Sequence, residues 1–360
     1  MPPPISSPRS PTPNLQPPLG FLTAYVPEEL FHAAGLTPAL IFHTPDEHGH
    51  ARTHLPGFTC WIAGSALDQA LAGKLDGLAG VALAQTCDNM QGLTDLWRRN
   101  VAHIPLLHFG MPLRLDGSSA RSYLLAELRS LRERTQALTG RPVTDDALQE
   151  SIALHNCTRG LVRRLYARAA DFAPPDLYGL VRAAFQTPKE LYNQEAESQI
   201  QDVTNLLPRS AAPLLLLVGP ALADPILFDV LAQAGTRVVG DLLDLGERYF
   251  AVDIAADGDP LEALADRLLA LVPTPTKHHP QRSRAAHLLS LVQERSADGV
   301  IFARQKFCEP HGFDYVQLAH ALDQADVPHL LVELEQASQA GQLRTRVEAF
   351  VEMLAYRNHP

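Results

Sequence analysis

The chain is poor in cysteine, in tryptophan and in long apolar runs, and each shortage argues against a class of protein. Its 360 residues include only four cysteines and two tryptophans. Four cysteines in a chain of this length do not make a disulfide scaffold. No run of about 18 apolar residues occurs, so no membrane-spanning helix is expected. The N-terminal region also lacks the apolar stretch that a signal peptide needs.

Basic residues are in the minority as well. Lys and Arg total 30 against 40 Asp and Glu, which gives a formal net charge of −10. Such a balance gives no reason to expect a nucleic acid or an anionic membrane as a partner. With no secretory signal, the few thiols point to metal binding or catalysis in a reducing compartment, and we expect a cytoplasmic protein.

Proline is abundant, and it is concentrated at the N-terminus. Eight of the first 18 residues are proline, with Ser, Thr and Arg among the others. Such a segment cannot bury enough apolar surface to fold. We therefore expect residues 1–18 to form a disordered tail that is partly polyproline II.

Beyond the tail, short apolar runs alternate with helix-like segments. The strand-like runs are 39–42, 80–85, 104–109, 213–218, 237–239, 300–302 and 329–334. Such runs with helices between them are typical of parallel sheets covered on both faces. The length suggests two or three domains. We predict an α/β fold of two doubly wound, Rossmann-like lobes, 19–116 and 206–360.

The middle of the chain has a different pattern, and we predict a mainly helical insert over 117–205. Leu124, Leu128 and Leu131 recur at helical spacing. Thr144 followed by two aspartates is a good helix start, because a hydroxyl cap and early carboxylates suit a helix N-terminus.

Three cysteines stand next to predicted helix starts. Cys87 follows the strand-like run 81–85, Cys308 follows the run 298–303 within a few residues, and Cys60 precedes a helix-like run. In open α/β folds, ligands bind at the carboxyl ends of strands. Three thiols gathered there predict a metal or cluster with one open coordination position, which distinguishes a catalytic metal site from a structural one.

Two other interpretations of the cysteines remain open at this point. A free cysteine often packs as a small buried hydrophobe, and we expect this of Cys157, which shares a helical face with Leu161 and Leu165. A tetrahedral zinc site could combine the three other cysteines with His311 or His54. The sequence lacks the close Cys-x-x-Cys pairs that are common in structural zinc sites.

Four segments occur together in an order that is specific to one family. They are Tyr25–Leu30 followed by Ala33–Gly35, Thr86–Gln91 with Asp95–Arg98, Asp298–Phe302 with Lys306–Pro310, and Gln342–Phe350. In these segments and in the cysteine positions the chain resembles the 2-hydroxyacyl-CoA dehydratase family, the family of the 2-hydroxyglutaryl-CoA dehydratase D-component, which is related to benzoyl-CoA reductase. The resemblance extends from about Gly20 to the C-terminus.

This resemblance implies a cofactor, a reaction and partners. It implies a [4Fe–4S] cluster held by Cys60, Cys87 and Cys308, with one iron open to a substrate oxygen. In the family, a separate ATP-dependent iron–sulfur activator protein supplies one electron. A ketyl radical forms at the thioester carbonyl, and water is eliminated from the 2-hydroxyacyl-CoA. The open iron would act as a Lewis acid. The enzyme is a lyase, usually a heterodimer with a homologous second subunit.

Two further side chains are candidate catalytic residues. By resemblance, Glu29 could relay a proton to the leaving hydroxyl, although a carboxylate at a helix start also has a simple stabilising role. Ser65 could donate a hydrogen bond to a cluster sulfur or a substrate oxygen, or it could cap the helix. The chain departs from its relatives near Gly64, where they often carry an arginine.

Two functions besides the dehydratase remain possible from the sequence. One is a low-potential reductase subunit of the benzoyl-CoA reductase type, an oxidoreductase with the same fold and ligands. The other is a non-enzymatic iron–sulfur partner protein that keeps the cluster without this chemistry.

Overall fold

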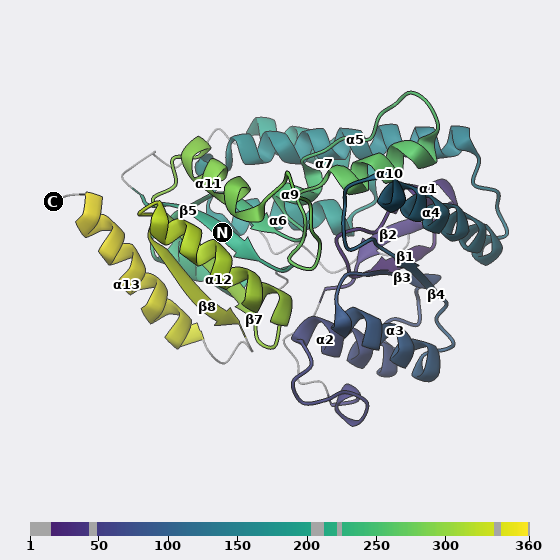
Figure 1. Cartoon of the computed structure of the whole chain (residues 1–360), viewed down its shortest axis with the longest axis horizontal. Helices are drawn as coiled ribbons and strands as arrows, with labels where there is room; N and C mark the ends of the chain where they lie inside the picture. Colours follow the sequence, from purple (N-terminus) through teal and green to yellow (C-terminus); the bar gives the residue numbers. More distant parts are fainter. Residues whose placement is uncertain (1–15, 43–48, 203–211, 222–224, 335–339, 359–360) are drawn as a thin grey trace.

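The computed structural model describes residues 16–42, 49–202, 212–221, 225–334 and 340–358 (Figure 1). Most of the predicted N-terminal tail, and the predicted boundary at 205–206, lie outside these residues. Pro18, which we assigned to the tail, is instead the first residue of a strand. Among the described helices, none combines the length and the apolar character that crossing a membrane requires.

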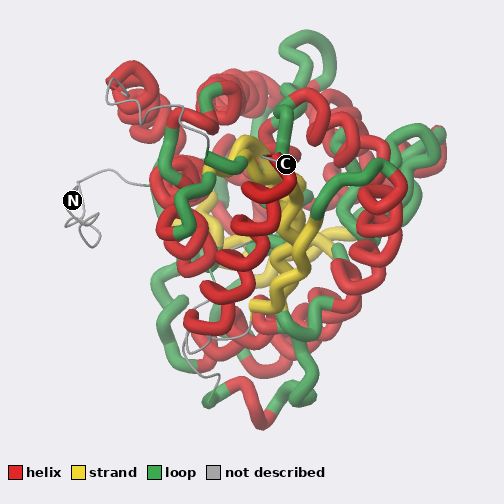
Figure 2. Tube along the Cα trace, turned by 90° about the vertical axis from the view of Figure 1, so that its left-hand side faces the viewer, coloured by secondary structure: helices red, strands yellow, loops and turns green. Residues whose placement is uncertain are grey.

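Two four-stranded parallel sheets form the centre of the molecule, surrounded by helices (Figure 2). In order across the first sheet, the strands are β2 (Thr37–Leu40), β1 (Pro18–Phe21), β3 (Gly80–Gln85) and β4 (Leu106–Gly110). In order across the second, they are β6 (Arg237–Leu243), β5 (Leu214–Gly219), β7 (Gly299–Gln305) and β8 (His329–Leu334). The prediction of the α/β class is confirmed.

Both sheets reverse their winding at an inner pair of strands. The chain leaves β1 for the edge strand β2 and then returns to β3 on the other side of β1, and it repeats this pattern with β5, β6 and β7. In open parallel sheets, ligands bind outside the carboxyl ends of strands at such a reversal. The reversal depends on β1, which we did not predict. Pro17 and Pro18 suggested a disordered tail, although the first position of a strand tolerates proline.

The helices fall into groups along the chain. In the first half they are α1 (Glu28–Ala33), η1 (Ala51–Thr53), α2 (Trp61–Leu71) and α3 (Asp88–Asn100). The middle contains α4 (Ser118–Thr139), α5 (Asp145–Ala167), η2 (Ala169–Asp171), α6 (Pro174–Gln186) and α7 (Lys189–Asp202). The second half contains α8 (Ile226–Gln233), α9 (Glu247–Phe250), α10 (Pro260–Ala270), α11 (Arg284–Glu294), α12 (Glu309–Gln324) and α13 (Ala340–Asn358).

The inner faces of the two sheets belong to one continuous apolar core. Because side chains alternate across a strand, β3 directs Ala82 and Ala84 into this core, and β5 directs Leu215 and Leu217 into it. Leucines and aromatic residues of α4, α5 and α6 fill the same core. The helical middle of the chain therefore packs between the sheets, and it joins their two inner faces.

The outer faces have separate, smaller cores. Val81 and Leu83 of β3 pack with apolar side chains of α2 and α3, including the fully buried Trp97. Leu216 and Val218 of β5 pack with α11 and α12 in the same way. Each sheet is therefore covered on both faces, as its near-continuous apolar strands require.

One segment of the second half, Thr274–His278, crosses to the first sheet, and we call it the strap. The Thr274 amide donates to the Tyr25 hydroxyl at 3.0 Å. His278 exchanges backbone hydrogen bonds of 2.8 Å with Leu113 and Leu115 after β4. The strap therefore fixes the second half of the chain against the carboxyl ends of β1 and β4.

We predict that Tyr25→Phe lowers the free energy of unfolding by about 1–3 kcal/mol, because the buried Thr274 amide loses its acceptor while the ring is kept. Urea denaturation of both proteins measures the change. Tyr356→Phe is the matched control, since Tyr356 is 84% exposed, and it should change stability by less than about 0.5 kcal/mol. Equal effects of the two substitutions would show that the strap contact contributes nothing.

Candidate functional site

Three of the four cysteines line one pocket, which we call the thiol pocket. Cys60, Cys87 and Cys308 lie in its wall. The polar residues of the lining include Thr86, Asp244, Thr274 and His311. These residues follow or adjoin the carboxyl ends of strands in both sheets, at the edge where the topology predicts a ligand. The structure thus brings together the three thiols that the sequence singled out.

Each thiol also stands at the start of a helix. Cys60 is the N-cap residue of α2, Cys87 that of α3 and Cys308 that of α12. The N-terminus of a helix carries unpaired backbone N–H groups and a partial positive charge, which favour an anion. Three such helix ends therefore converge on the thiol pocket, and all three favour the ionised thiolate.

Burial opposes this ionisation. It raises the pKa of the Cys60 thiol to about 11, although the backbone N–H groups of the first turn of α2 act in the other direction. Burial raises the pKa of Cys87 and of Cys308 as well, and for Cys308 the neighbouring Cys60 thiol adds to the rise. The three thiols are neutral by themselves at neutral pH, so their ionisation requires a further positive charge in the pocket.

A buried lysine supplies one positive charge beside this site. Lys277 of the strap is only 7% exposed, and its Nζ donates to the carbonyl oxygens of Gln85 at 3.1 Å and Met111 at 3.2 Å. Burial lowers the pKa of Lys277 to about 8, while the Cys87 thiolate acts to raise it. The sequence does not reveal this residue, because no local motif marks a lysine that reaches a strand end from a distant loop.

A histidine–carboxylate pair completes the polar lining. His311 Nε2 and Asp244 Oδ2 are 3.0 Å apart. Burial raises the pKa of Asp244, but the charge of His311, with those of Arg248 and Arg284, outweighs burial and holds this pKa below its ordinary value. Asp244 is therefore an anion that orients the His311 ring. From the sequence we expected His311 only as a zinc ligand, and we did not predict a role for Asp244.

Glu29 lies elsewhere, in a buried ionic cluster. It is 1% exposed and pairs with Arg159 of α5. Its neighbour Glu28 pairs with Lys189 at 2.8 Å and accepts a hydrogen bond from the Tyr249 hydroxyl. Glu29 is not among the residues that line the thiol pocket, and its role in proton transfer stays a prediction.

Ser65 is also absent from the lining of the thiol pocket. It is fully buried in the second turn of α2, and its hydroxyl accepts a hydrogen bond from Gln69 Nε2 at 3.2 Å. The N-cap position belongs to Cys60, so the interpretation of Ser65 as the helix cap is wrong. Its contact with a ligand stays a prediction.

The expectation that Cys157 is buried is wrong, because its side chain is exposed. The buried face of α5 includes Ser151, His155 and Thr158, polar residues that an apolar pattern does not reveal. Since 3.6 residues make one turn, side chains four residues apart differ in direction by about 40° around the helix axis. Cys157 therefore lies off the buried face although Leu161 and Leu165 lie on it.

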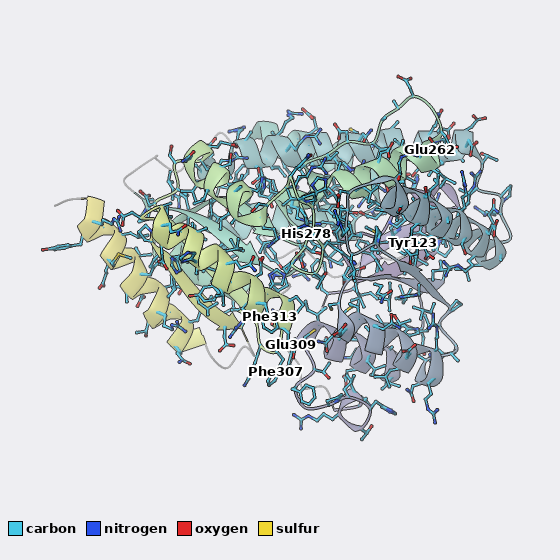
Figure 3. The ribbon with its side chains drawn as sticks, in the orientation of Figure 1. Tyr123, Glu262, His278, Phe307, Glu309 and Phe313 are labelled. Carbon is cyan, nitrogen blue, oxygen red and sulfur yellow. The ribbon has the colours of Figure 1, made fainter. Side chains whose placement is uncertain are left out.

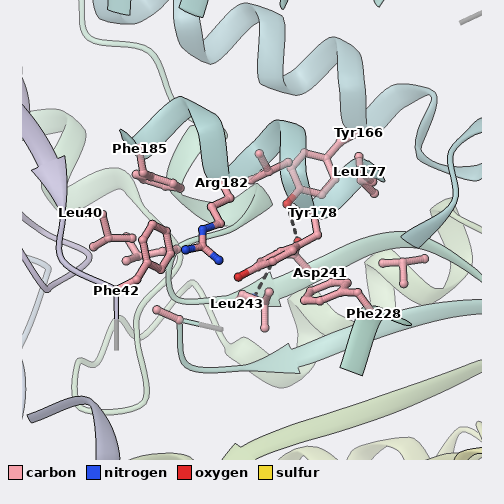
Figure 4. A pocket seen from close by; sticks show the side chains of 14 residues that line it. Leu40, Phe42, Tyr166, Leu177, Tyr178, Arg182, Phe185, Phe228, Asp241 and Leu243 are labelled. Atoms are coloured by element: carbon pink, nitrogen blue, oxygen red, sulfur yellow. Dashed lines mark hydrogen bonds between the residues drawn. The ribbon is translucent and has the colours of Figure 1, made fainter. Parts of the chain in front are cut away.

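A smaller, mainly apolar cavity adjoins the thiol pocket, and Ala221 and Leu245 line both. Figure 4 shows Tyr178 stacked on Phe228 and Arg182 beside Phe42. The ring centroids of Tyr178 and Phe228 are 4.1 Å apart, and the Arg182 guanidinium lies 4.1 Å from the centre of the Phe42 ring. This lining suits an uncharged, apolar part of a ligand.

The zinc interpretation finds no support in the arrangement of the side chains. Within the described ranges, no group of three His, Cys, Asp or Glu side chains surrounds a position for a single metal ion. His311 lines the thiol pocket but pairs with Asp244. His54 is not part of that lining.

Comparison with known proteins matches nearly the whole chain to one family. The family described as "2-hydroxyglutaryl-CoA dehydratase, D-component" matches residues 23–354. The matched region contains both sheets, apart from β1, and all three cysteines of the thiol pocket.

Individual relatives are similar over nearly their full length. The chain is 25% identical to the (R)-phenyllactyl-CoA dehydratase beta subunit of Clostridium sporogenes, over 93% of this chain and 91% of that protein. It is 26% identical to the beta subunit of (R)-2-hydroxyglutaryl-CoA dehydratase of Acidaminococcus fermentans, over 93% and 92% respectively. It is also 26% identical to one of the subunits of the benzoyl-CoA reductase of Thauera aromatica, over 91% and 87%.

His155, next to the Glu28 cluster, leads to a prediction about pH. Burial, with the charge of Lys189, lowers the pKa of His155 to about 3, whereas an unfolded histidine titrates near 6.5. Between these values the unfolded chain binds a proton that the folded protein does not, so stability falls as the pH falls. We expect the wild type to lose on the order of 1–2 kcal/mol more than His155→Gln between about pH 7 and pH 5.

Urea unfolding at a series of pH values measures this difference. His103→Gln is the control, because the His103 side chain is 57% exposed, and this variant should keep the loss of stability at low pH that His155 causes in the wild type. A curve for His155→Gln that is also parallel to the wild type would show that His155 binds its proton equally in the folded and the unfolded protein, which contradicts the prediction.

Proposed function

Since this chain belongs to the 2-hydroxyglutaryl-CoA dehydratase D-component family, we propose that it is a [4Fe–4S]-binding subunit of a 2-hydroxyacyl-CoA dehydratase, a lyase. The observation that carries the proposal is the convergence of Cys60, Cys87 and Cys308, from three helix N-termini, on one pocket between the sheets. The iron and sulfide content of the purified chain tests the cofactor directly.

The donor set of the thiol pocket fits such a cofactor. Thiolates are the usual ligands of iron–sulfur clusters. In the structure, the three thiols share the lining of one pocket. The buried thiols ionise only against positive charge, and a metal centre supplies it. Bound there by three thiolates, the cluster would supply one-electron chemistry and a Lewis-acidic iron.

The chain's own residues have two tasks at this site. The Lys277 ammonium, held by two carbonyl oxygens, offsets the negative charge of the thiolates. The His311 imidazole contacts the Asp244 carboxylate through Nε2, and this contact orients the ring in the wall of the thiol pocket, where an imidazole can act as a general acid or base. Charge compensation and acid–base chemistry would thus come from different side chains around the same pocket.

The acyl-CoA substrate class rests on the relatives. Their names describe dehydratases of phenyllactyl-CoA, lactoyl-CoA and 2-hydroxyglutaryl-CoA. The apolar side chains of the cavity beside the thiol pocket would contact the apolar part of an acyl group. Several relatives are named as beta subunits, and we propose a homologous second subunit here too. An ATP-dependent iron–sulfur activator protein would deliver the electron.

A reductase role is the second candidate. The benzoyl-CoA reductase relative is as similar to this chain as the dehydratase subunits are. A reductase of this type would use the same thiol pocket for electron transfer to its substrate, without loss of water. Product analysis separates the two functions, because only the dehydratase forms a 2,3-unsaturated acyl-CoA from a 2-hydroxyacyl-CoA.

We predict about four iron and four acid-labile sulfide atoms per chain after anaerobic purification. Replacing any one of Cys60, Cys87 and Cys308 by Ser should remove most of both, because each supplies one of three ligands. Colorimetric iron and sulfide assays, with EPR after dithionite reduction, measure the content. Cys157→Ser is the matched control and should keep the full content, since Cys157 is exposed and does not line the pocket.

Two results would contradict the proposal. One is a chain that binds no iron after reconstitution. The other is iron content that survives the three pocket substitutions and depends on Cys157 instead. Tightly bound zinc in place of iron would support the zinc interpretation.

We predict that Lys277→Met lowers the reduction potential of the reconstituted centre, because removing a nearby positive charge destabilises the more negative reduced state. Lys277→Arg, which keeps the charge, should retain a potential close to that of the wild type. Potentiometric titration monitored by EPR measures both variants. Equal potentials in Lys277→Met and the wild type would show that the strap lysine serves only to hold the strands.

A further inference from the structure

A second cavity is lined by residues that adjoin two of the thiols in the sequence. It has a volume of about 500 Å³, within the range of small-molecule sites. Thr59 and Trp61 line it, and the intervening Cys60 lines the thiol pocket. Phe307 lines it too, and the next residue, Cys308, again lines the thiol pocket. We call it the outer cavity.

The lining of the outer cavity combines positive charge with aromatic rings. Arg52 and Lys306 supply the charge, and Trp61 and Phe307 supply the rings. None of its described lining residues is acidic. Cations bind phosphate groups, and exposed aromatic rings stack on planar bases. The combination points to a ligand that carries phosphate and a heteroaromatic ring.

The cationic and aromatic groups are held in place by the surrounding structure. Asp68 Oδ1 accepts hydrogen bonds from the amides of His50 at 2.7 Å and Ala51 at 3.0 Å, which fixes the turn that carries Arg52. The Lys306 ammonium lies 5.3 Å from the centre of the Phe307 ring. The loop that presents them is therefore built before any ligand arrives, which lowers the cost of binding.

Phe307 has an unusual backbone as well. Its φ is +63°, a left-handed conformation that bulky residues rarely adopt, and its side chain is 42% exposed. Strained residues of this kind cluster at ligand sites. Figure 3 shows Phe307 at the end of α12 nearest to α2, where a ring can cover a ligand in the outer cavity.

We propose that the outer cavity binds a phosphorylated nucleotide through Arg52 and Lys306, with its base against Trp61 or Phe307. If the chain has the function proposed above, this nucleotide is the nucleotide end of the acyl-CoA; this choice of ligand rests on the proposed function. A free adenine nucleotide has the same chemistry, and a fluorescence titration distinguishes the two sources.

Trp61 provides the signal for the test. The other of the two tryptophans, Trp97, is fully buried, and its Nε1 donates to the Ile104 carbonyl oxygen. Titration of the full-length, metal-free chain with coenzyme A and with ADP should therefore change the fluorescence of Trp61. Trp61→Phe should abolish the change. Pantetheine, which lacks the nucleotide, should give no change at the same concentrations.

Substitutions test the residues themselves. Arg52→Gln and Lys306→Gln should each weaken coenzyme A binding by about three- to tenfold. Arg99→Gln, an exposed arginine on α3 outside the outer cavity, is the control and should leave the affinity unchanged. Gly57→Tyr tests the outer cavity without changing its charge. A Cβ atom at Gly57 meets no atom within 4 Å, so the fold should tolerate the change while the ring fills the cavity.

Clear results would overturn the proposal. Binding of pantetheine as tight as that of coenzyme A would overturn the nucleotide site, and so would full affinity in Arg52→Gln, Lys306→Gln and Gly57→Tyr. A preference of about tenfold for coenzyme A over ADP supports the acyl-CoA source, and equal affinities overturn that source in favour of a free nucleotide. The titration uses metal-free protein, whereas the proposed function is tested by the iron content. A failure of coenzyme A binding can therefore be distinguished from a failure of the proposed function.

Discussion

The contact that the rest of the site depends on is the insertion of the strap, Thr274–His278, at the carboxyl ends of the first sheet. Its anchors are the Tyr25 hydroxyl, two carbonyl oxygens that receive the Lys277 ammonium, and backbone hydrogen bonds to the segment after β4. Cys60 and Cys87 belong to the first half of the chain and Cys308 to the second. Without the strap, nothing local to the thiols would align their three helices on one pocket.

The shared core makes this alignment rigid. Side chains of β3 and β5 enter the same apolar cluster, and α4, α5 and α6 fill the space between them. Protein interiors are close-packed and transmit strain, so a shift of one sheet must displace the helices of the other. The thiol pocket therefore depends on the whole fold, although its three cysteines lie in short loops.

Electrostatics explains why the pocket needs its buried charges. Burial raises the pKa of each thiol, whereas three helix N-termini and Lys277 favour the thiolates. Asp244 opposes them, and His311 and two arginines balance it. The buried cluster of Glu28, Glu29, Arg159 and Lys189 is a separate paired network. Such pairs contribute less to stability than their number suggests, because each ion loses its hydration.

The sequence by itself determined the class of the fold and the identity of the three thiols. The boundaries of β3 and β8 follow from apolar runs, and the positions of the cysteines before helices follow from local pattern, because these features depend on neighbouring residues. Tertiary structure decided what depends on distant contacts. It revealed β1 behind its prolines, turned Cys157 to the surface, and placed Glu29 with Arg159. It also brought Lys277 to the end of a strand 192 residues away, a proximity that only the packing of two sheets around one core can create.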